Sequence, residues 1–333
     1  MEQMIGPKPH KGGRLLLRMC GIMALCLQLG GCVTLVDRHF KARLDAPNGS
    51  IDIAGLRETV VVRRDAYGIP FVDAKNKEDM ALAVGYVHAT DRLTQMISMK
   101  MLSEGRLSEM GGPVMVDLDI YMRAMDLAGA AETLFKNVSA ENRKLLESYS
   151  KGVNAYLDSH KDRLPPELAL AGFKPEPWQP IDSVKVFTLV NLGLSSNIAE
   201  EIASLNLVRA VGAEKTAWML PIYPDEPIPL DEAAKLKGID LNKAAESVKD
   251  LAGLHPLLSS LSLGGIAASN NWAIAKKRTK NGASIFCNDM HLPLGIPSLW
   301  NMIHVRCGDY DAAGMSIAGA PVVVAGYNGN LAW

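Results

Sequence analysis

The stretch GGIAASNNWAIAKK, residues 264–277, places small residues directly before Ser269 and an apolar, strand-like segment after Asn270 and Asn271. A buried strand that begins with a serine behind a linker-like segment suits one kind of chemistry. If the chain is cut between Ala268 and Ser269, the new first residue carries a hydroxyl nucleophile and a free α-amine. That amine has a pKa of roughly 7.7–8.0 and can act as the base for its own hydroxyl. The pattern therefore predicts self-cleavage before Ser269, with the preceding segment as a removable spacer.

The patterns on the two sides of Ser269 differ, because helical spacing dominates before it and strand-like runs dominate after it. Two apolar runs around a turn predict a strand–turn–strand over residues 58–74, and Asn76 is suited to cap the helix that follows. A helix-rich first part and a strand-rich second part indicate an α+β fold. The expected helices are 77–103, 126–160 and 181–211; residues 223–268 are expected to be loop-rich and then weakly helical, with LLSSLSLGG (257–265) as a linker.

The N-terminus has the pattern of an export signal. Basic residues precede the short apolar stretch MCGIMALCLQL, which is too short to span a bilayer, and LGGC follows at 29–32. This exit resembles a bacterial lipobox and predicts that Cys32 is the lipidated first residue of a periplasmic protein; ordinary cleavage and no export are the alternatives. The net charge of −1 argues against nucleic-acid binding and against membrane binding by bulk charge, so the lipid would be the membrane contact.

Longer motifs on both sides of Ser269 resemble the penicillin acylase family of N-terminal nucleophile hydrolases. SNNWAIAKKRTKNGASIFCNDMHL (269–292) is similar to the start of that family's catalytic chain, and DAYGIPFVDA (65–74) and DRLTQM (91–96) are similar to its N-terminal chain. The resemblance implies αββα layers within an α+β fold, here truncated, with a helix-rich N-terminal part. The chain then divides into a signal peptide (1–32), a tether (33–57), a helical part (58–222), a spacer region (223–268) and the first catalytic strands (269–333), which we expect to be incomplete.

The resemblance assigns roles to single residues. Ser269 matches the nucleophile, and self-cleavage would occur at the Ala268–Ser269 bond. His291 matches a position where some members carry histidine, which implies an orienting or proton-relay role. Glu201 matches a carboxylate that binds a structural calcium in some members, and no cofactor is implied for catalysis. Two departures are Ala268, where glycine is common in the family, and Tyr327, where histidine is usual.

Simpler interpretations stand beside these roles. Ser269 and the asparagines after it are also consistent with an ordinary turn. Cys287, Asp289 and His291 alternate and would share one face of a strand, as in a metal site, although a structural strand with a buried Cys287 is favoured. Cys287 and Cys307 are expected to stay separate thiols rather than form a disulfide. The remaining structural interpretations are a core histidine at His88, a buried pair of Asp91 and Arg92, and a solvated helix face at Glu200 and Glu201.

Two hypotheses of different classes follow. The first is the precursor of an exported hydrolase that cleaves linear amides, with penicillin-like compounds and N-acyl-homoserine lactones as the two substrate classes. Its partners would be the small-molecule amide and the remainder of its own catalytic chain. Because the family's oxyanion-hole donors match positions after Trp333, we expect these 333 residues to be inactive alone. The second hypothesis is a truncated, inactive lipoprotein fragment that acts as an interaction or structural module.

Overall fold

The computed structural model describes residues 38, 40–42, 48–220, 238–260, 268–292 and 294–333. The predictions for the signal, for Cys32 and for the linker from residue 261 onward fall outside these ranges and stay predictions. Within the described ranges, no helix has the length and apolar character needed to cross a membrane.

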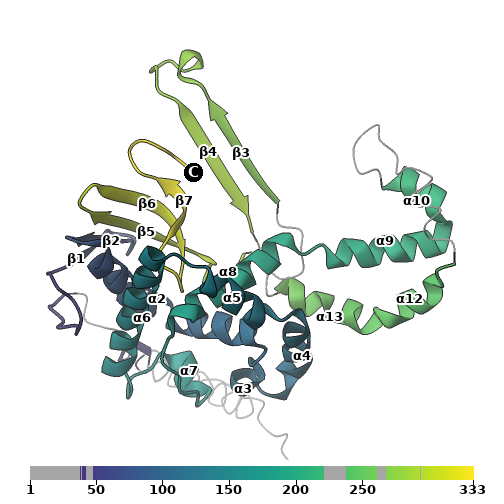
Figure 1. Ribbon diagram of the computed structural model, residues 1–333, viewed down its shortest axis with the longest axis horizontal. Coiled ribbons are helices and arrows are strands. Elements are labelled where there is room, and N and C mark those ends of the chain that lie inside the picture. The colour runs from purple at the N-terminus through teal and green to yellow at the C-terminus, as the bar shows by residue number, and fades with distance from the viewer. Residues whose placement is uncertain (1–37, 39, 43–47, 221–237, 261–267, 293) are drawn as a thin grey trace, which may run out of the picture.

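Helices dominate the part before Ser269 and strands the part after it, so the α+β prediction is confirmed (Figure 1). The α-helices are α2 (Lys77–Glu104), α3 (Ser108–Gly111), α4 (Val116–Met125), α5 (Leu127–Lys136), α6 (Ala140–Ser159), α7 (Pro166–Leu170), α8 (Pro180–Ser195), α9 (Ile198–Val211), α10 (Ala213–Met219), α12 (Leu241–Ser247) and α13 (Lys249–Ser260). The strands are β1 (Val61–Arg64), β2 (Pro70–Ala74), β3 (Ala268–Ile274), β4 (Ile285–His291), β5 (Trp300–Cys307), β6 (Tyr310–Ile317) and β7 (Val323–Tyr327), and the short 3₁₀ helices are η1 (Pro113–Met115) and η2 (Lys276–Arg278).

The main sheet contains strands from both sides of Ser269. Its order is β1-β2-β5-β6-β7, and β1 and β2 form the predicted antiparallel hairpin. β2 pairs in parallel with β5, with Phe71 opposite His304, and the other neighbours are antiparallel. Backbone hydrogen bonds therefore join the two parts of the chain that a cut before Ser269 would separate.

Helix α2 packs against this sheet and α6 packs against α2, and the core lies between the helices and the sheet (Figure 1). Alternate residues of the strands point into that core, such as Val72 of β2 and Val305 of β5. The two helices approach closely at Gly85 and Gly152. A Cβ atom at Gly152 would overlap the Leu82 carbonyl on α2, so only glycine fits at this contact.

The first long helix begins where the sequence predicts. The Asn76 side chain accepts the backbone N–H of Asp79, and Gly105 ends the helix in the left-handed region with φ 60°. Two predicted helices are each split into two. Residues 126–160 form α5 and α6, because Ser139 caps a new helix by accepting the N–H of Asn142. Residues 181–211 form α8 and α9, because the backbone at Ser196 is extended.

Two parts extend away from this body. Helices α9, α10, α12 and α13 form an arm, and β3 and β4 form a separate two-stranded hairpin (Figure 1). The prediction of a linker over 257–265 is wrong for residues 257–260, which lie within α13. The prediction of a buried strand after Ser269 is also wrong. Trp272 is 49% exposed because, among the described strands, β3 pairs only with β4.

Candidate active site

Ser269 is the second residue of β3 and is exposed. The bond between Ala268 and Ser269 lies inside this strand. The Cα register partner of Ser269 on β4 is Met290.

His291 lies at the end of β4, and its register partner is Ala268. Because side chains alternate along paired strands, His291 and Ser269 point to opposite faces of the hairpin. The imidazole Nε2 lies 2.7 Å from Oδ2 of Asp289. In the uncut chain, the structure therefore brings His291 to a carboxylate and not to the serine.

Cys287, Asp289 and His291 do share one face, as the alternation predicts. Cys287 is half-buried, which corrects the expectation of a buried position, and both Cys287 and Cys307 are free thiols. Within the described ranges, no group of three or more His, Cys, Asp or Glu residues is placed to hold a metal ion. The structure thus gives no support to a metal site on β4.

Glu201 lies in the first turn of α9, and its carboxylate accepts a 3.0 Å hydrogen bond from Nδ2 of Asn197. Both Glu200 and Glu201 are exposed, as predicted for a solvated helix face. An acidic first turn is favourable to the helix dipole. The local contacts of Glu201 thus already explain its position, and the calcium role stays a prediction.

A buried chain of hydrogen bonds joins the two sides of the cleavage position. The N–H of Gly319 donates to Oη of Tyr149 at 2.9 Å, and Oγ of Ser316 donates to the Asn301 carbonyl at 2.7 Å. His88 lies between them, with Nδ1 3.0 Å from Oη of Tyr149 and Nε2 3.2 Å from Oγ of Ser316. Because the Ser316 proton is used on Asn301, the imidazole donates from Nε2 and accepts from Tyr149 at Nδ1. A neutral histidine satisfies every member of this chain.

Burial keeps these groups neutral. Burial, together with the smaller effect of the positive charge of Arg92 one turn further along α2, lowers the pKa of His88 to about 3. Burial also raises the pKa of Tyr149. The prediction that His88 is a core histidine is confirmed. Its partners lie on α6 and β6 and could not be identified from local sequence.

The predicted buried pair of Asp91 and Arg92 is wrong. Asp91 is exposed, and its carboxylate accepts two hydrogen bonds from Arg64 at 2.9 and 2.8 Å. Arg92 is half-buried, and its guanidinium donates to the carbonyls of Ser298 and Trp300 at 2.8 and 3.4 Å. Adjacent helical residues point about 100° apart, so the two side chains reach different neighbours.

A buried charge cluster that the sequence patterns did not reveal joins α2 and α8. Nζ of Lys100 lies 2.8 Å from Oδ2 of Asp182, and Nζ of Lys185 lies 2.9 Å from Oδ1 of the same carboxylate. Lys185 also contacts Glu104 at 2.5 Å. The cluster is fully paired, which buried charges require, and it is a structural crosslink between helices.

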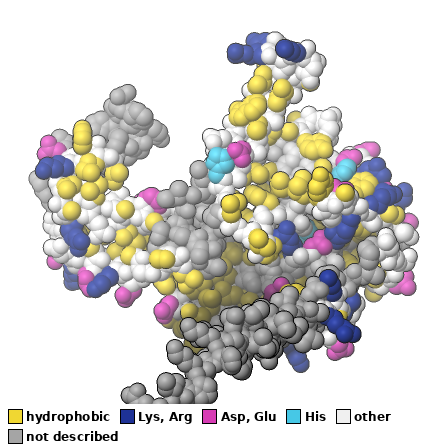
Figure 2. Space-filling model, turned by 180° about the vertical axis from the view of Figure 1, so that it is seen from behind, with side chains coloured by type: hydrophobic (Ala, Val, Ile, Leu, Met, Phe, Trp, Pro, Cys, Tyr) yellow, Lys and Arg dark blue, Asp and Glu magenta, His cyan; other side chains and the backbone are white. Residues whose placement is uncertain are grey.

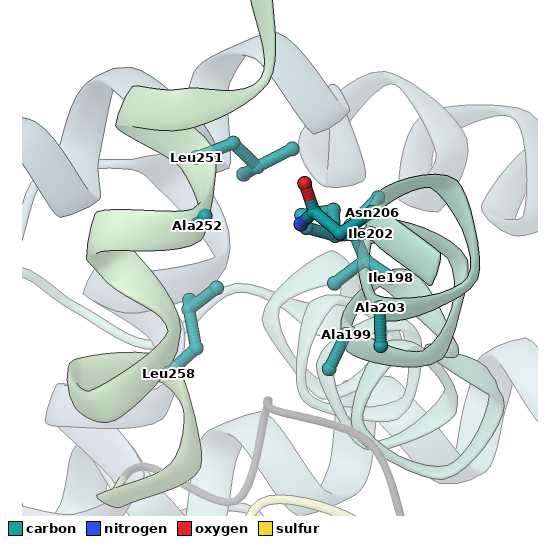
Figure 3. A pocket seen from close by; sticks show the side chains of 8 residues that line it. All are labelled: Ile198, Ala199, Ile202, Ala203, Asn206, Leu251, Ala252 and Leu258. Carbon is teal, nitrogen blue, oxygen red and sulfur yellow. The ribbon is translucent and has the colours of Figure 1, made fainter. Parts of the chain in front are cut away.

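A cavity of about 310 Å³ lies between α9 and α13 in the arm (Figure 3). Its walls are apolar apart from the Asn206 amide, which points into it. One wall comes from α13, within the region that the sequence predicts to be a removable spacer, so removal of the spacer would open the cavity. Its lining residues are Ile198, Ala199, Ile202, Ala203, Asn206, Leu251, Ala252 and Leu258.

The hairpin presents two kinds of surface (Figure 2). Lys and Arg side chains gather at its tip, where η2 contributes Lys276, Lys277 and Arg278. Hydrophobic side chains follow along it, and Trp272 and Phe286 are exposed there. The region around Ser269 is thus accessible from solvent in the described part of the chain.

Comparison with known proteins gives a consistent result. The family model described as Penicillin amidase matches residues 59–333. The chain is 46% identical over 320 residues to "Acyl-homoserine lactone acylase QuiP" of Pseudomonas aeruginosa, which covers 95% of this chain and 38% of that protein. It is 34% identical to "Penicillin acylase 2 proenzyme" of Pseudomonas sp. (strain SE83), over 86% of this chain and 37% of that protein. The chain thus spans less than two fifths of the length of these relatives.

Solved structures are also similar to this chain. One of them is the thermostable penicillin G acylase from Alcaligenes faecalis, with a TM-score of 0.44, 25% sequence identity, and coverage of 51% of this chain and 96% of that chain.

Proposed function

The chain belongs to the penicillin amidase family, and from this premise we propose that it is the N-terminal portion of an amide hydrolase with Ser269 as the nucleophile. The self-cleavage that frees Ser269 is an acyl shift followed by hydrolysis. Oγ of Ser269 attacks the carbonyl carbon of Ala268, the C–N bond breaks, and the nitrogen becomes the α-amine of Ser269. Water then hydrolyses the ester, and the amine is free to act as the base in later turnovers.

The observation that carries this proposal is the place of Ser269 at the base of an exposed hairpin, directly after the spacer region. A cut there would leave the body intact, because the β2–β5 ladder and the His88 chain of hydrogen bonds hold the two parts together. The name "proenzyme" of one relative is consistent with processing. Ala268 has a Cβ that the family's usual glycine lacks, so we expect slow self-cleavage.

We expect His291 to take its orienting or proton-relay role only after the cut. The new chain end at Ser269 is then free to leave its register on β4, and the serine can turn toward the face that carries His291. The contact with Asp289 favours one imidazole tautomer, with Nε2 as the donor. For Glu201 the proposed calcium role needs ligands from outside the described part of the chain.

For the substrate we propose an N-acyl-homoserine lactone in preference to a penicillin-like amide. The relative with the lactone in its name is 46% identical to this chain, whereas the penicillin acylase of Pseudomonas sp. is 34% identical. Both classes offer a linear amide with an acyl side chain. We also propose that Cys32 anchors the protein to a membrane in the periplasm through a lipid. The non-catalytic fragment hypothesis has less support from these relatives than the hydrolase hypothesis.

The test uses the complete open reading frame that contains the Trp333 codon, in wild-type, Ser269→Ala and Ser269→Cys forms. Mass spectrometry should find a wild-type chain that begins at Ser269 and an uncut Ser269→Ala chain. Release of homoserine lactone from an N-acyl substrate, measured in parallel, should be lost in Ser269→Ala. Ser269→Cys should still self-cleave but turn over slowly, because the positioned intramolecular attack is less demanding than turnover. Substrate hydrolysis by Ser269→Ala at the wild-type rate would show that the nucleophile is another residue.

A further inference from the structure

The motif DRLTQM (91–96) contains side chains that pack in the core and side chains that form hydrogen bonds with a distant segment. Leu93 and Met96 are buried in the core under the sheet. Arg92 and Gln95 instead point toward the segment between β4 and β5, where Nε2 of Gln95 donates to the Ser298 carbonyl at 3.0 Å. Packing thus explains two of the six residues, and two others have partners on the far side of Ser269 in the chain.

Arg92 and Gln95 act together on this segment. The guanidinium donates to the carbonyls of Ser298 and Trp300, at 2.8 and 3.4 Å, and to Oε1 of Gln95 at 3.1 Å. Hydrogen bonds from a charged donor are stronger than neutral ones. The backbone of α2 also leaves helical geometry at Arg92, with φ −143° and ψ 20°. The helix is therefore kinked at the residue whose side chain makes this contact.

The segment that they hold connects the hairpin to the main sheet. β4 ends at His291 and β5 begins at Trp300. The hairpin pairs only within itself among the described strands, so its direction depends on the joints at its two ends. One joint is residues 261–267, outside the described ranges, and the other is the segment that ends at Trp300.

We propose that Arg92 and Gln95 are positioning residues that lock the joint between the hairpin and the sheet and thereby place Ser269 for self-cleavage. The inference rests on the proposed function of Ser269. It assigns a role to two residues that do not contact Ser269. It also explains why α2, which precedes the cleavage position, carries two polar side chains that donate hydrogen bonds to the segment before β5. After the cut the two sides of the lock would lie in different product chains, so its hydrogen bonds would then connect those chains.

The test compares Arg92→Met, Arg92→Lys and Gln95→Leu with the wild type, all expressed from the complete reading frame. The matched control is Arg64→Met, which removes the paired hydrogen bonds to Asp91 in the same motif but leaves the joint untouched. The rate of amide hydrogen exchange in the peptide that contains residues 298–301 measures directly how firmly this segment is held. The rate of cleavage before Ser269 measures whether the lock places the serine for self-cleavage. This rate is measured by mass spectrometry at a temperature well below the melting midpoint of every variant.

We expect Arg92→Met to speed exchange at 298–301 by about tenfold or more and to slow cleavage by a similar factor. Gln95→Leu should show smaller changes in the same direction. Arg92→Lys should restore part of the protection from exchange and part of the cleavage rate. Its ammonium keeps the positive charge but lacks the planar set of N–H donors of the guanidinium. Arg64→Met should change neither.

Unchanged exchange in Arg92→Met, or faster exchange with cleavage at the wild-type rate, would overturn the proposal. An uncut wild-type chain would instead refute the proposed self-cleavage. In that case exchange alone decides whether Arg92 and Gln95 lock the joint, because the exchange measurement does not depend on the chemistry of Ser269.

Discussion

Acidification should weaken this fold through one buried histidine. His88 is 0% exposed and is neutral in its chain of hydrogen bonds between Tyr149 and Ser316. Protonation would place a hydrogen on Nδ1, where the imidazole now accepts the Tyr149 hydroxyl. The charge would also lie near the guanidinium of Arg92 on the same helix. The perturbation is therefore a fall in pH, compared between the wild type and His88→Gln.

The size of the effect follows from the two pKa values. In the folded chain burial lowers the pKa of His88 from 6.5 to about 3. The unfolded chain therefore binds a proton between these values and the folded chain does not, so stability is present above pH 6.5 and is lost as the pH falls toward 3. The full loss is about 5 kcal/mol, and the part between pH 8 and pH 5 is about 2 kcal/mol.

The assay is urea unfolding followed by circular dichroism at pH 8 and pH 5. The free energy of unfolding of the wild type should fall by about 2 kcal/mol more than that of His88→Gln, in which the titrating group is absent. Val153→Ala serves as the matched control, because it weakens the same core on α6 but keeps His88. It should show the wild-type pH dependence. Equal pH dependence in the wild type and His88→Gln would refute the assignment of a buried neutral histidine.

Three further predictions concern other parts of the chain. Gly152→Ala should lower the free energy of unfolding by about 3 kcal/mol, because its Cβ would overlap the backbone of α2, whereas Gly253→Ala, with no atom within 4 Å, should be neutral or slightly stabilising in a thermal melt. Iodoacetamide should modify Cys287 before Cys307, since burial raises the pKa of the Cys307 thiol, and peptide mapping that finds equal rates would contradict the structure. Metabolic labelling with a fatty acid should mark the wild type but not Cys32→Ala, and equal labelling would exclude lipidation at this residue.

Local signals in the sequence predicted most of the elements. The β1–β2 hairpin and the start of α2 at Asn76 are confirmed because a turn and a helix cap depend on neighbouring residues only. The motif around Ser269 predicted a strand that begins there, and β3 includes it. The family was also predicted from motifs, because a motif is identified from the order of its residues and does not require the contacts to be known.

Local signals failed where two segments meet. The break between α8 and α9 at Ser196 has no proline to mark it, and Gly193 lies within α8. The exposure of β3 depends on which strands lie beside it. The position of Asp91 and Arg92 in the middle of a helix among apolar residues predicted a buried pair, but their side chains point in different directions and have separate partners.

By itself, the sequence determined the fold class, the family and the candidate nucleophile Ser269. Only the tertiary structure decided the partners of His88, the lock made by Arg92 and Gln95, and the pairing of β2 with β5 across the cleavage position. The physical reason is the range of the interactions. Caps, turns and strand patterns depend on residues a few positions apart, whereas Ser316 lies 228 positions from His88 and Ser298 lies 206 positions from Arg92. Contacts at that separation exist only once the layers have packed.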